Sequence, residues 1–148
     1  MTPRAKLWNI LHDGVIVQIK RHGSGDLALT IEIPYLRRMI SQGDNIIVTL
    51  RRCSGFSMKI CGLDLTTDDL DLIAVQRTEI LSTESEDAPV HVITTLGEID
   101  ADFDSFSLTQ DDGKAITFDA LCDACERYWT RWEQQSKENK NGRTDACT

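Results

Sequence analysis

The stretch VIVQIKRHGSGDLALTIEI, residues 15–33, contains two runs in which apolar and polar side chains alternate. In the first run, Val15, Val17 and Ile19 share one parity, and residues 27–33 alternate in the same way. Alternation with period two places successive side chains on opposite faces of a β-strand. The intervening polar sequence HGSGD is typical of a turn. The stretch therefore predicts an antiparallel hairpin.

Further strand patterns follow along the chain. Residues 46–50 and 56–60 flank a Ser-Gly turn and predict a second hairpin. Residues 70–81 are rich in β-branched side chains and are expected to be extended. Residues 90–96 and 99–108 predict a third strand pair around a glycine. The connections are too short for helical crossovers, so the sheet is expected to be antiparallel, with about seven or eight strands, barrel-like or in two layers.

Two segments have helical character. Pro34 can open a short helix as its first residue. Residues 118–134 repeat apolar side chains at helical spacing and predict a long C-terminal amphipathic helix. Residues 135–148 are polar without an apolar stripe, so we expect a disordered tail after a single domain of residues 1–134. The expected fold class is α+β with mainly antiparallel β-structure.

Charge is distributed unevenly along the 148 residues, whose net charge is −8 at pH 7. Residues 1–63 contain nine Lys and Arg against four Asp and Glu, whereas residues 64–148 contain seven against twenty. Such a chain should be repelled by nucleic acid, and its second half suits a cationic partner. The acidic surface can equally serve only to keep the protein soluble.

The sequence has features of a cytoplasmic protein. Residues 1–8 lack the apolar run of a signal peptide, and no stretch approaches the ~18 apolar residues of a membrane span. The five cysteines are an odd number in a chain long enough to fold without disulfides. We therefore expect a reducing compartment and no membrane partner.

The sequence LCDACERYW, residues 121–129, contains a Cys-x-x-Cys pair. Zinc would need four converging ligands, and Cys53 and Cys61 are too widely spaced to complete the usual pattern. A redox pair normally starts a helix, whereas Cys122 and Cys125 lie a turn inside the predicted one. The apolar stripe around them favours a core position, because free cysteine behaves as a small hydrophobe. We expect neither a metal nor a cofactor.

Asp100, Asp102 and Asp104 alternate with apolar residues and are the candidate site residues. The spacing resembles a calcium loop only briefly, because the sixth position is Ser105 and the twelfth is Asp111. On a strand, the three carboxylates would form an acidic ridge that either receives Lys and Arg from a partner or discourages aggregation. The alternation then changes parity, which predicts a β-bulge near Asp104 or Ser105.

No catalytic set is evident in the sequence. The glycines of the HGSGD turn lie between strands, whereas a phosphate-binding loop must be followed by a helix N-terminus. His12-Asp13 precedes a glycine and is expected to form a bend, because the further histidines and aspartates of a metal phosphohydrolase are missing. We therefore expect a protein without catalytic residues.

Three segments, WNILHDGVIVQI, GDLALTIEIPYL and DGKAITFDALCDACERYWTRWE, resemble a group of small uncharacterised bacterial β-rich proteins. Some of these are similar to immunity proteins of polymorphic toxin systems. The resemblance implies a non-enzymatic cytoplasmic protein that binds and neutralises a toxin domain, often a basic nuclease. Two alternatives remain open: a small-ligand binder or enzyme that uses a cavity in the curled sheet, and a homodimer that pairs basic and acidic halves.

Overall fold

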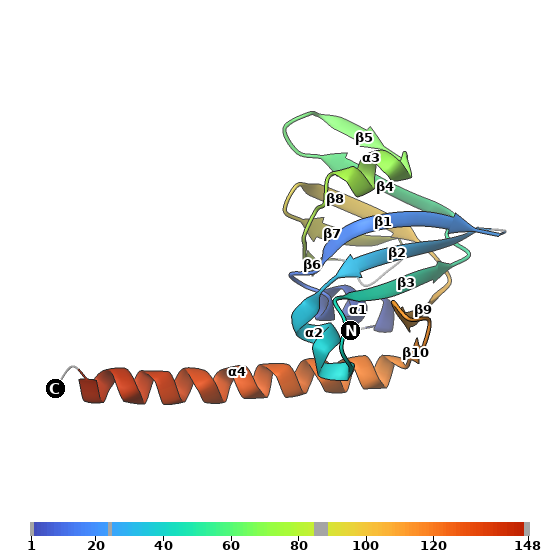
Figure 1. The fold of residues 1–148 in the computed structure, drawn as a ribbon. Coiled ribbons are helices and arrows are strands. Elements are labelled where there is room, and N and C mark those ends of the chain that lie inside the picture. Colours follow the sequence, from blue (N-terminus) through green and yellow to red (C-terminus); the bar gives the residue numbers. More distant parts are fainter. Residues whose placement is uncertain (1, 24, 85–88, 147–148) are drawn as a thin grey trace.

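The computed structural model describes residues 2–23, 25–84 and 89–146, with side chains described up to residue 138. These residues form two antiparallel sheets of five strands each and four helices, so the predicted α+β class is confirmed (Figure 1). The helices are α1 (Pro3–Ile10), α2 (Pro34–Ile40), α3 (Leu70–Val75) and α4 (Phe118–Ala146). The strands are β1 (Val15–His22), β2 (Asp26–Glu32), β3 (Asn45–Arg51), β4 (Gly55–Ile60), β5 (Leu65–Thr67), β6 (Ile80–Thr83), β7 (Val90–Thr94), β8 (Gly97–Asp102), β9 (Ser105–Gln110) and β10 (Ala115–Ile116).

The first sheet has the strand order β1-β2-β3-β9-β10. β1 and β2 form the predicted hairpin. A register shift between Ile16 and Gln18 changes which β1 side chains face inward. Ile16 and Ile19 are buried, whereas Val15 and Val17 are partly exposed, so the predicted parity was wrong at the start of the strand. A β-bulge causes this change, because one extra residue reverses the alternation.

The second sheet has the order β5-β4-β8-β7-β6. β7 and β8 form the predicted strand pair. Gly97 begins β8, and a side chain there would collide with the backbone carbonyl of Lys59 on β4. The close approach of β4 therefore requires a glycine at this position.

Two crossings carry the chain between the sheets, and they overturn two predictions. β3 and β4 belong to different sheets, so the second hairpin was wrong. Residues 99–108 are not one bulged strand, because β8 ends at Asp102 and β9 begins in the other sheet. The crossings lie side by side: the Ser54 amide donates to the Asp102 carbonyl at 2.9 Å, and the Asp104 amide donates to the Arg51 carbonyl at 2.9 Å.

At another edge, the two sheets meet where β1 begins. Val15 forms an isolated bridge with Glu79, just before β6. The Ile16 amide donates to the Thr78 carbonyl at 3.0 Å, and the Ile80 amide donates to the Gly14 carbonyl at 2.8 Å. The fold is thus two layers joined along this edge, with apolar side chains from both sheets packed between them in one core.

Two helices were missed in the sequence. α1 buries Ala5, Leu7, Trp8 and Ile10. Residues 70–81 were expected to be extended, but the first six form α3. Asp69 caps this helix by accepting hydrogen bonds from the amides of Asp71 and Leu72 at 3.1 and 3.2 Å. An N-cap aspartate favours helix initiation, and here it prevails over the weak β preference of the segment.

α2 begins at Pro34 as predicted and places Arg37 in the interior. The Arg37 guanidinium donates to the Asn45 carbonyl at 3.0 Å, to Ser41 at 2.8 Å and to Asp111 at 2.8 Å. A buried arginine is tolerated only when its donors are satisfied in this way. The contacts fix α2 against the turn between β9 and β10.

α4 begins at Phe118 as predicted but continues to Ala146, so the expected tail from residue 135 is helical up to that point. Its first half packs against α2 and α1. Its second half extends away from the sheets (Figure 1). Residues 133–146 contain six Glu, Gln and Lys and also six Ser, Asn, Gly, Thr and Asp, so neither helix propensity nor an apolar stripe predicted this continuation of the helix.

Candidate functional site

β8 carries two of the three candidate aspartates on its outer side. Asp100 and Asp102 are exposed, whereas Ile99, which precedes them, and Ala101, which lies between them, are buried in the core. Successive residues of a strand point to opposite faces, so both carboxylates face solvent from the second sheet.

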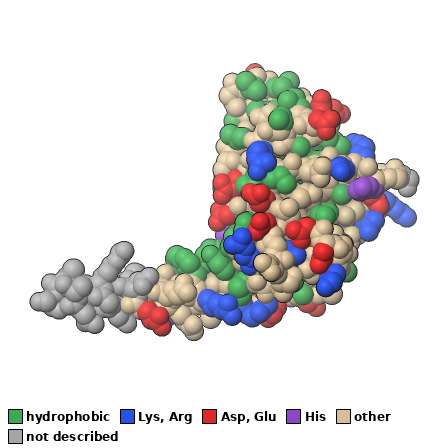
Figure 2. All heavy atoms as spheres, viewed as in Figure 1, with side chains coloured by type: hydrophobic (Ala, Val, Ile, Leu, Met, Phe, Trp, Pro, Cys, Tyr) green, Lys and Arg blue, Asp and Glu red, His purple; other side chains and the backbone are tan. Residues whose placement is uncertain are grey.

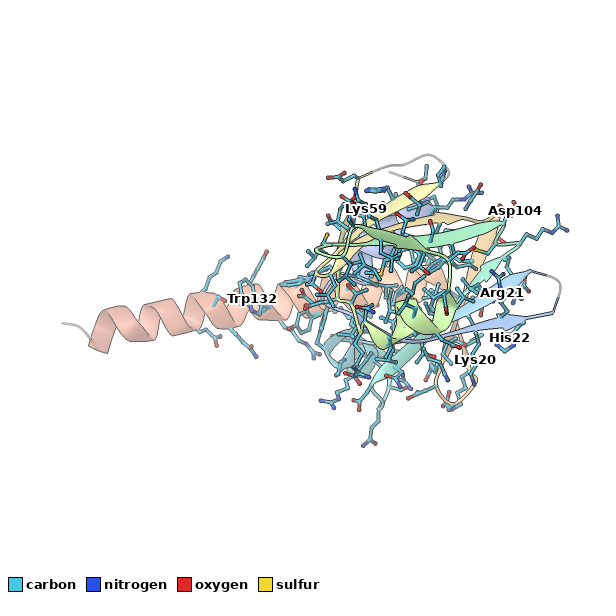
Figure 3. The ribbon with its side chains drawn as sticks, turned by 90° about the horizontal axis from the view of Figure 1, so that it is seen from above. Lys20, Arg21, His22, Lys59, Asp104 and Trp132 are labelled. Atoms are coloured by element: carbon cyan, nitrogen blue, oxygen red, sulfur yellow. The ribbon has the colours of Figure 1, made fainter. Side chains whose placement is uncertain are left out.

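Asp104 lies apart from them, in the crossing between β8 and β9. Its carboxylate is 3.7 Å from the guanidinium of Arg52, and its backbone carbonyl accepts a hydrogen bond from Arg4 at 2.6 Å. Figure 3 shows Asp104 at the end of the molecule that also carries Arg21 and His22. The structure therefore separates Asp104 from the other two aspartates and gives it cationic neighbours.

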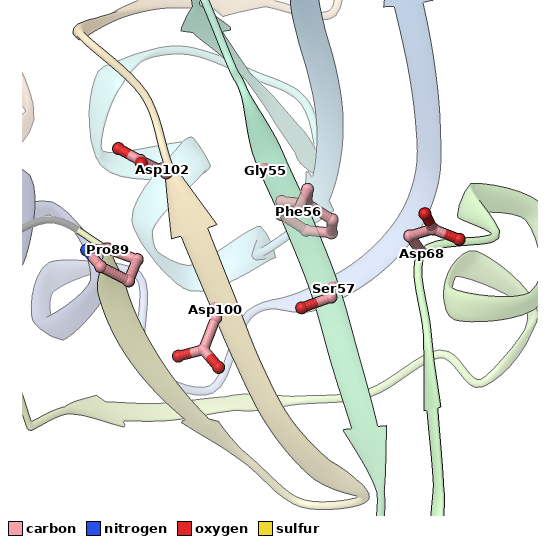
Figure 4. A pocket seen from close by; sticks show the side chains of 7 residues that line it. All are labelled: Gly55, Phe56, Ser57, Asp68, Pro89, Asp100 and Asp102. Carbon is pink, nitrogen blue, oxygen red and sulfur yellow. The ribbon is translucent and has the colours of Figure 1, made fainter.

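A shallow depression of about 350 Å³ lies around the two β8 carboxylates (Figure 4). It is open to solvent and is bordered by β4, β8, the residue before β7 and the segment after β5. Asp68 brings a third carboxylate to its rim. The residues that line it are Gly55, Phe56, Ser57, Asp68, Pro89, Asp100 and Asp102.

Strand register places a polar row across the outer face of this sheet. Asp100 is paired with Ser57 of β4 on one side and with His91 of β7 on the other. Glu98, one pleat away on β8, has Lys59 as its cross-strand neighbour. The four carboxylates Asp68, Glu98, Asp100 and Asp102 thus belong to one surface, which we term the acidic face.

His91 is tied to this face by two carboxylates. Its Nδ1 lies 2.7 Å from Oδ1 of Asp100, and its Nε2 lies 3.7 Å from Oε1 of Glu98. The hydrogen bond with Asp100 raises the pKa of His91, and the nearby negative charges act in the same direction against a smaller opposing effect of burial. The imidazole therefore favours the protonated form more than a free histidine does.

The acidic face carries more negative than positive charge. Among residues 2–23, 25–84 and 89–138, no Lys or Arg lies within ion-pair distance of Asp68, Asp100 or Asp102. Lys59 and the partly exposed His91 are the nearby basic side chains on the same sheet face. A surface with such an excess of negative charge attracts cations over a distance of about 10 Å at moderate ionic strength.

The row of Ser57, Asp100 and His91 does not form a nucleophile triad. In such a triad the imidazole lies between the hydroxyl and the carboxylate and accepts the hydroxyl proton. Here the carboxylate of Asp100 occupies the middle strand. The arrangement supports a charge-assisted hydrogen bond and surface negative charge, which suit recognition.

Sequence reasoning missed part of the acidic face. Glu98 has the parity of Asp100 and could have been found from that alternation. Asp68 lies beyond β5, a strand that sequence reasoning did not identify, so nothing local placed it near β8. The contact of His91 depends on the β7–β8 register, which a sequence pattern does not fix.

The Cys-x-x-Cys pair lies on the inner side of α4. Cys122 and Cys125 are partly buried and pack against the hydrophobic core. Burial raises the pKa of both thiols, which lowers their reactivity at neutral pH. In the described part of the chain, no three His, Cys, Asp or Glu side chains group as a metal site would require. Cys147 is outside the described residues.

A second surface lies where α4 leaves the body. The rings of Tyr35 on α2 and Tyr128 on α4 have centroids 4.5 Å apart, and Trp129 stacks on His12 at 5.3 Å. Trp132 contacts Trp129 edge to face and is 50% exposed. Figure 2 shows hydrophobic side chains and Lys or Arg side chains gathered at this end of the helix.

Comparison with known proteins does not assign this chain to a group: no family model, curated protein or solved structure matches it. Within the described residues, none of the helices combines the length and apolar character needed to cross a membrane.

Proposed function

We propose that this protein is a non-enzymatic, cytoplasmic protein-binding module whose acidic face docks a cationic partner. A basic toxin domain is a partner of the right chemistry, in line with the resemblance of the sequence to immunity-type proteins. The observation that carries the proposal is the cluster of carboxylates around one shallow depression. Asp100 contacts only His91, and Asp68 and Asp102 have no basic side chain within ion-pair distance among the described side chains.

The arrangement suits a protein surface better than a small molecule. The depression is open, so it would leave much of a small ligand in solvent, whereas ligand sites usually enclose most of theirs. The carboxylates of Asp100 and Asp102 project from β8, whose position is fixed by ladders of hydrogen bonds on both sides. A rigid array of like charge both steers a cationic partner and fixes its orientation.

The experiment compares three forms of the tagged protein in capture from native lysate. The first is wild type, the second carries Asp100→Asn and Asp102→Asn, and the third carries Asp112→Asn and Asp119→Asn. The control removes the same charge from exposed positions away from the acidic face. Capture is repeated at about 50 mM and about 500 mM salt, because screening weakens exposed charge pairs.

We expect a protein of basic isoelectric point to be retained at low salt by wild type and by the control. The Asp100→Asn/Asp102→Asn form should retain at least about tenfold less of it, since each lost charge pair weakens both steering and docking. The purified partner should then bind wild type directly. Equal retention by all three forms, or retention of no basic protein by wild type, would contradict the proposal.

A further inference from the structure

Two leucines are exposed at the end of the second sheet where β4 turns into β5. Leu63, in the turn between these strands, is 65% exposed, and Leu96, in the turn between β7 and β8, is 42% exposed. The two turns are adjacent, because the amide of Cys61 in the first turn donates to the carbonyl of Leu96 at 2.9 Å. We term Leu63 and Leu96 the apolar tip. Figure 2 shows hydrophobic side chains at the top of the molecule, where Figure 1 places the β4–β5 hairpin.

The apolar tip adjoins the acidic face. Leu96 precedes β8, and Glu98, Asp100 and Asp102 follow it along this strand. β8 has six residues and spans roughly 20 Å at about 3.4 Å per residue. A standard protein interface of about 800 Å² per partner is roughly 30 Å across. One partner can therefore cover the apolar tip and the acidic face together.

Carboxylates border the apolar tip. Asp64 follows Leu63 directly and has no basic side chain within ion-pair distance among the described side chains. Glu98 contacts His91 at 3.7 Å, and its cross-strand neighbour Lys59 contributes one positive charge to this region. A partner with basic side chains around an apolar patch complements such a surface, whereas an acidic partner is repelled by it.

Exposed carboxylates alone give weak docking. An ion pair in solvent contributes little to affinity, because water and salt screen the charges. Removal of apolar surface from water contributes more, in proportion to the area that the partner covers. Protein interfaces accordingly combine an apolar centre with a polar rim. The apolar tip supplies the component that the acidic face lacks.

We propose that the apolar tip and the acidic face form one docking surface for a single partner, a basic protein with an apolar patch beside its Lys and Arg side chains. The inference rests on the proposed docking of a cationic partner and adds the contact that holds this partner in place. The carboxylates of the acidic face accelerate association. Burial of Leu63 and Leu96 slows dissociation, because most differences in affinity between related complexes are differences in the dissociation rate.

Two synthetic peptides of equal charge test the proposal, one that alternates Lys with Leu and one that alternates Lys with Ser. Titration calorimetry measures the Kd of each peptide for the full chain. We expect wild type to bind the Lys-Leu peptide at least about tenfold more tightly, since only this peptide covers the apolar tip with apolar groups. Leu63→Ser/Leu96→Ser should bind the two peptides equally. Leu63→Ser alone, at the more exposed position, should already reduce the ratio of the two Kd values.

Trp132→Ala is the control for exposed apolar surface elsewhere. Trp132 is 50% exposed and lies on α4, which Figure 1 places on the opposite side of the molecule from the β4–β5 hairpin. Trp132→Ala should therefore keep the wild-type ratio. Asp100→Asn/Asp102→Asn should weaken binding of both peptides and leave their ratio unchanged. Circular dichroism in the far ultraviolet checks that each variant is folded.

Equal affinity of wild type for the two peptides, or a ratio that survives Leu63→Ser/Leu96→Ser, would overturn the inference and leave the acidic face as a docking site. Failure of wild type to bind either peptide would count against the proposed function as well. A second copy of the chain is the competing occupant of the apolar tip. A wild-type dimer in sedimentation equilibrium that becomes a monomer in Leu63→Ser/Leu96→Ser would assign the tip to self-association and overturn the inference.

Discussion

His91 on β7 and Asp100 on β8 are opposed across the two strands, with Nδ1 of the imidazole 2.7 Å from Oδ1 of the carboxylate. This hydrogen bond raises the pKa of His91 in the folded protein. A raised folded pKa means that the stabilising contribution is fully present below the unfolded pKa of about 6.5. It is lost as the pH rises through the folded pKa.

We therefore predict that His91→Asn destabilises the fold more near about pH 5.5 than near about pH 8.5. Urea unfolding at both pH values measures the difference. His22→Asn is the control, because His22 is exposed at the end of the β1–β2 hairpin. If His91→Asn lowers the unfolding free energy equally at the two pH values, the contact with Asp100 is not formed in solution.

The same titration should modulate docking on the acidic face. Protonation of His91 adds positive charge beside Asp100 and Glu98, so attraction for a cationic partner weakens as the pH falls through its pKa. With an oligolysine peptide as probe, we expect weaker binding to wild type near about pH 5.5 than near about pH 8. His91→Gln should reduce the pH dependence of peptide binding. If that dependence is unchanged in the variant, protonation of His91 does not control docking.

Removal of the buried Arg37 should be among the most destabilising changes. Arg37→Ala leaves the Asn45 and Ser41 carbonyls without their donor and empties the volume of a buried side chain, which is expected to cost about 2 kcal/mol or more of unfolding free energy. Gly43→Ala should also destabilise, because its Cβ would lie 2.7 Å from Nη2 of Arg37 and its φ is +151°. Arg38→Ala is the control, since this arginine is exposed. Thermal unfolding ranks the stabilities of the three variants. If Arg37→Ala destabilises the protein no more than Arg38→Ala does, the hydrogen bonds described for the buried Arg37 are not formed.

Gly97 should not tolerate even a methyl group. Its Cβ would collide with the backbone carbonyl of Lys59, which cannot move without displacing β4. We predict that Gly97→Ala lowers the unfolding free energy by about 2 kcal/mol or more. Gly55→Ala provides the comparison, because its Cβ would meet only the Cβ of Asp102 at 3.8 Å. Equal stabilities for the two variants in urea would disprove the close approach.

Thiol reactivity should follow exposure, with Cys61 alkylated first in a Cys147→Ser background. Cys122 and Cys125 should react more slowly, since burial restricts access and raises the pKa of both thiols. Mass spectrometry of timed iodoacetamide reactions identifies the order in which the cysteines react.

Replacing both Cys122 and Cys125 by Ala should lower the unfolding free energy by about 1 kcal/mol, with no change in the metal content of the purified protein. Stoichiometric zinc, lost in the variant, would reverse this interpretation.

The acidic face shows how far the candidate site could be predicted. Alternation along residues 99–103 placed Asp100 and Asp102 on the solvent side, and the structure bears out that placement. The same alternation grouped Asp104 with them, but the chain crosses to the other sheet there and brings Asp104 beside Arg52. Asp68 joined the face only through the fold, because side-chain parity carries no information about which distant segment lies alongside.

What the sequence by itself determined is the local structure: the β1–β2 hairpin, the proline-initiated α2 and the start of α4. Each depends on contacts or preferences within a few residues, so its signal is present in a short window. Only the tertiary structure decided how strands were divided between the sheets. The chain crosses between the sheets after Arg51 and after Asp102, and its apolar residues face the same core on both sides of each crossing. The alternation of apolar and polar residues is therefore the same for a hairpin within one sheet and for a crossing to the other sheet. The division of the strands between the two sheets also determines which carboxylates lie on the same face, and so it determines the composition of the acidic face.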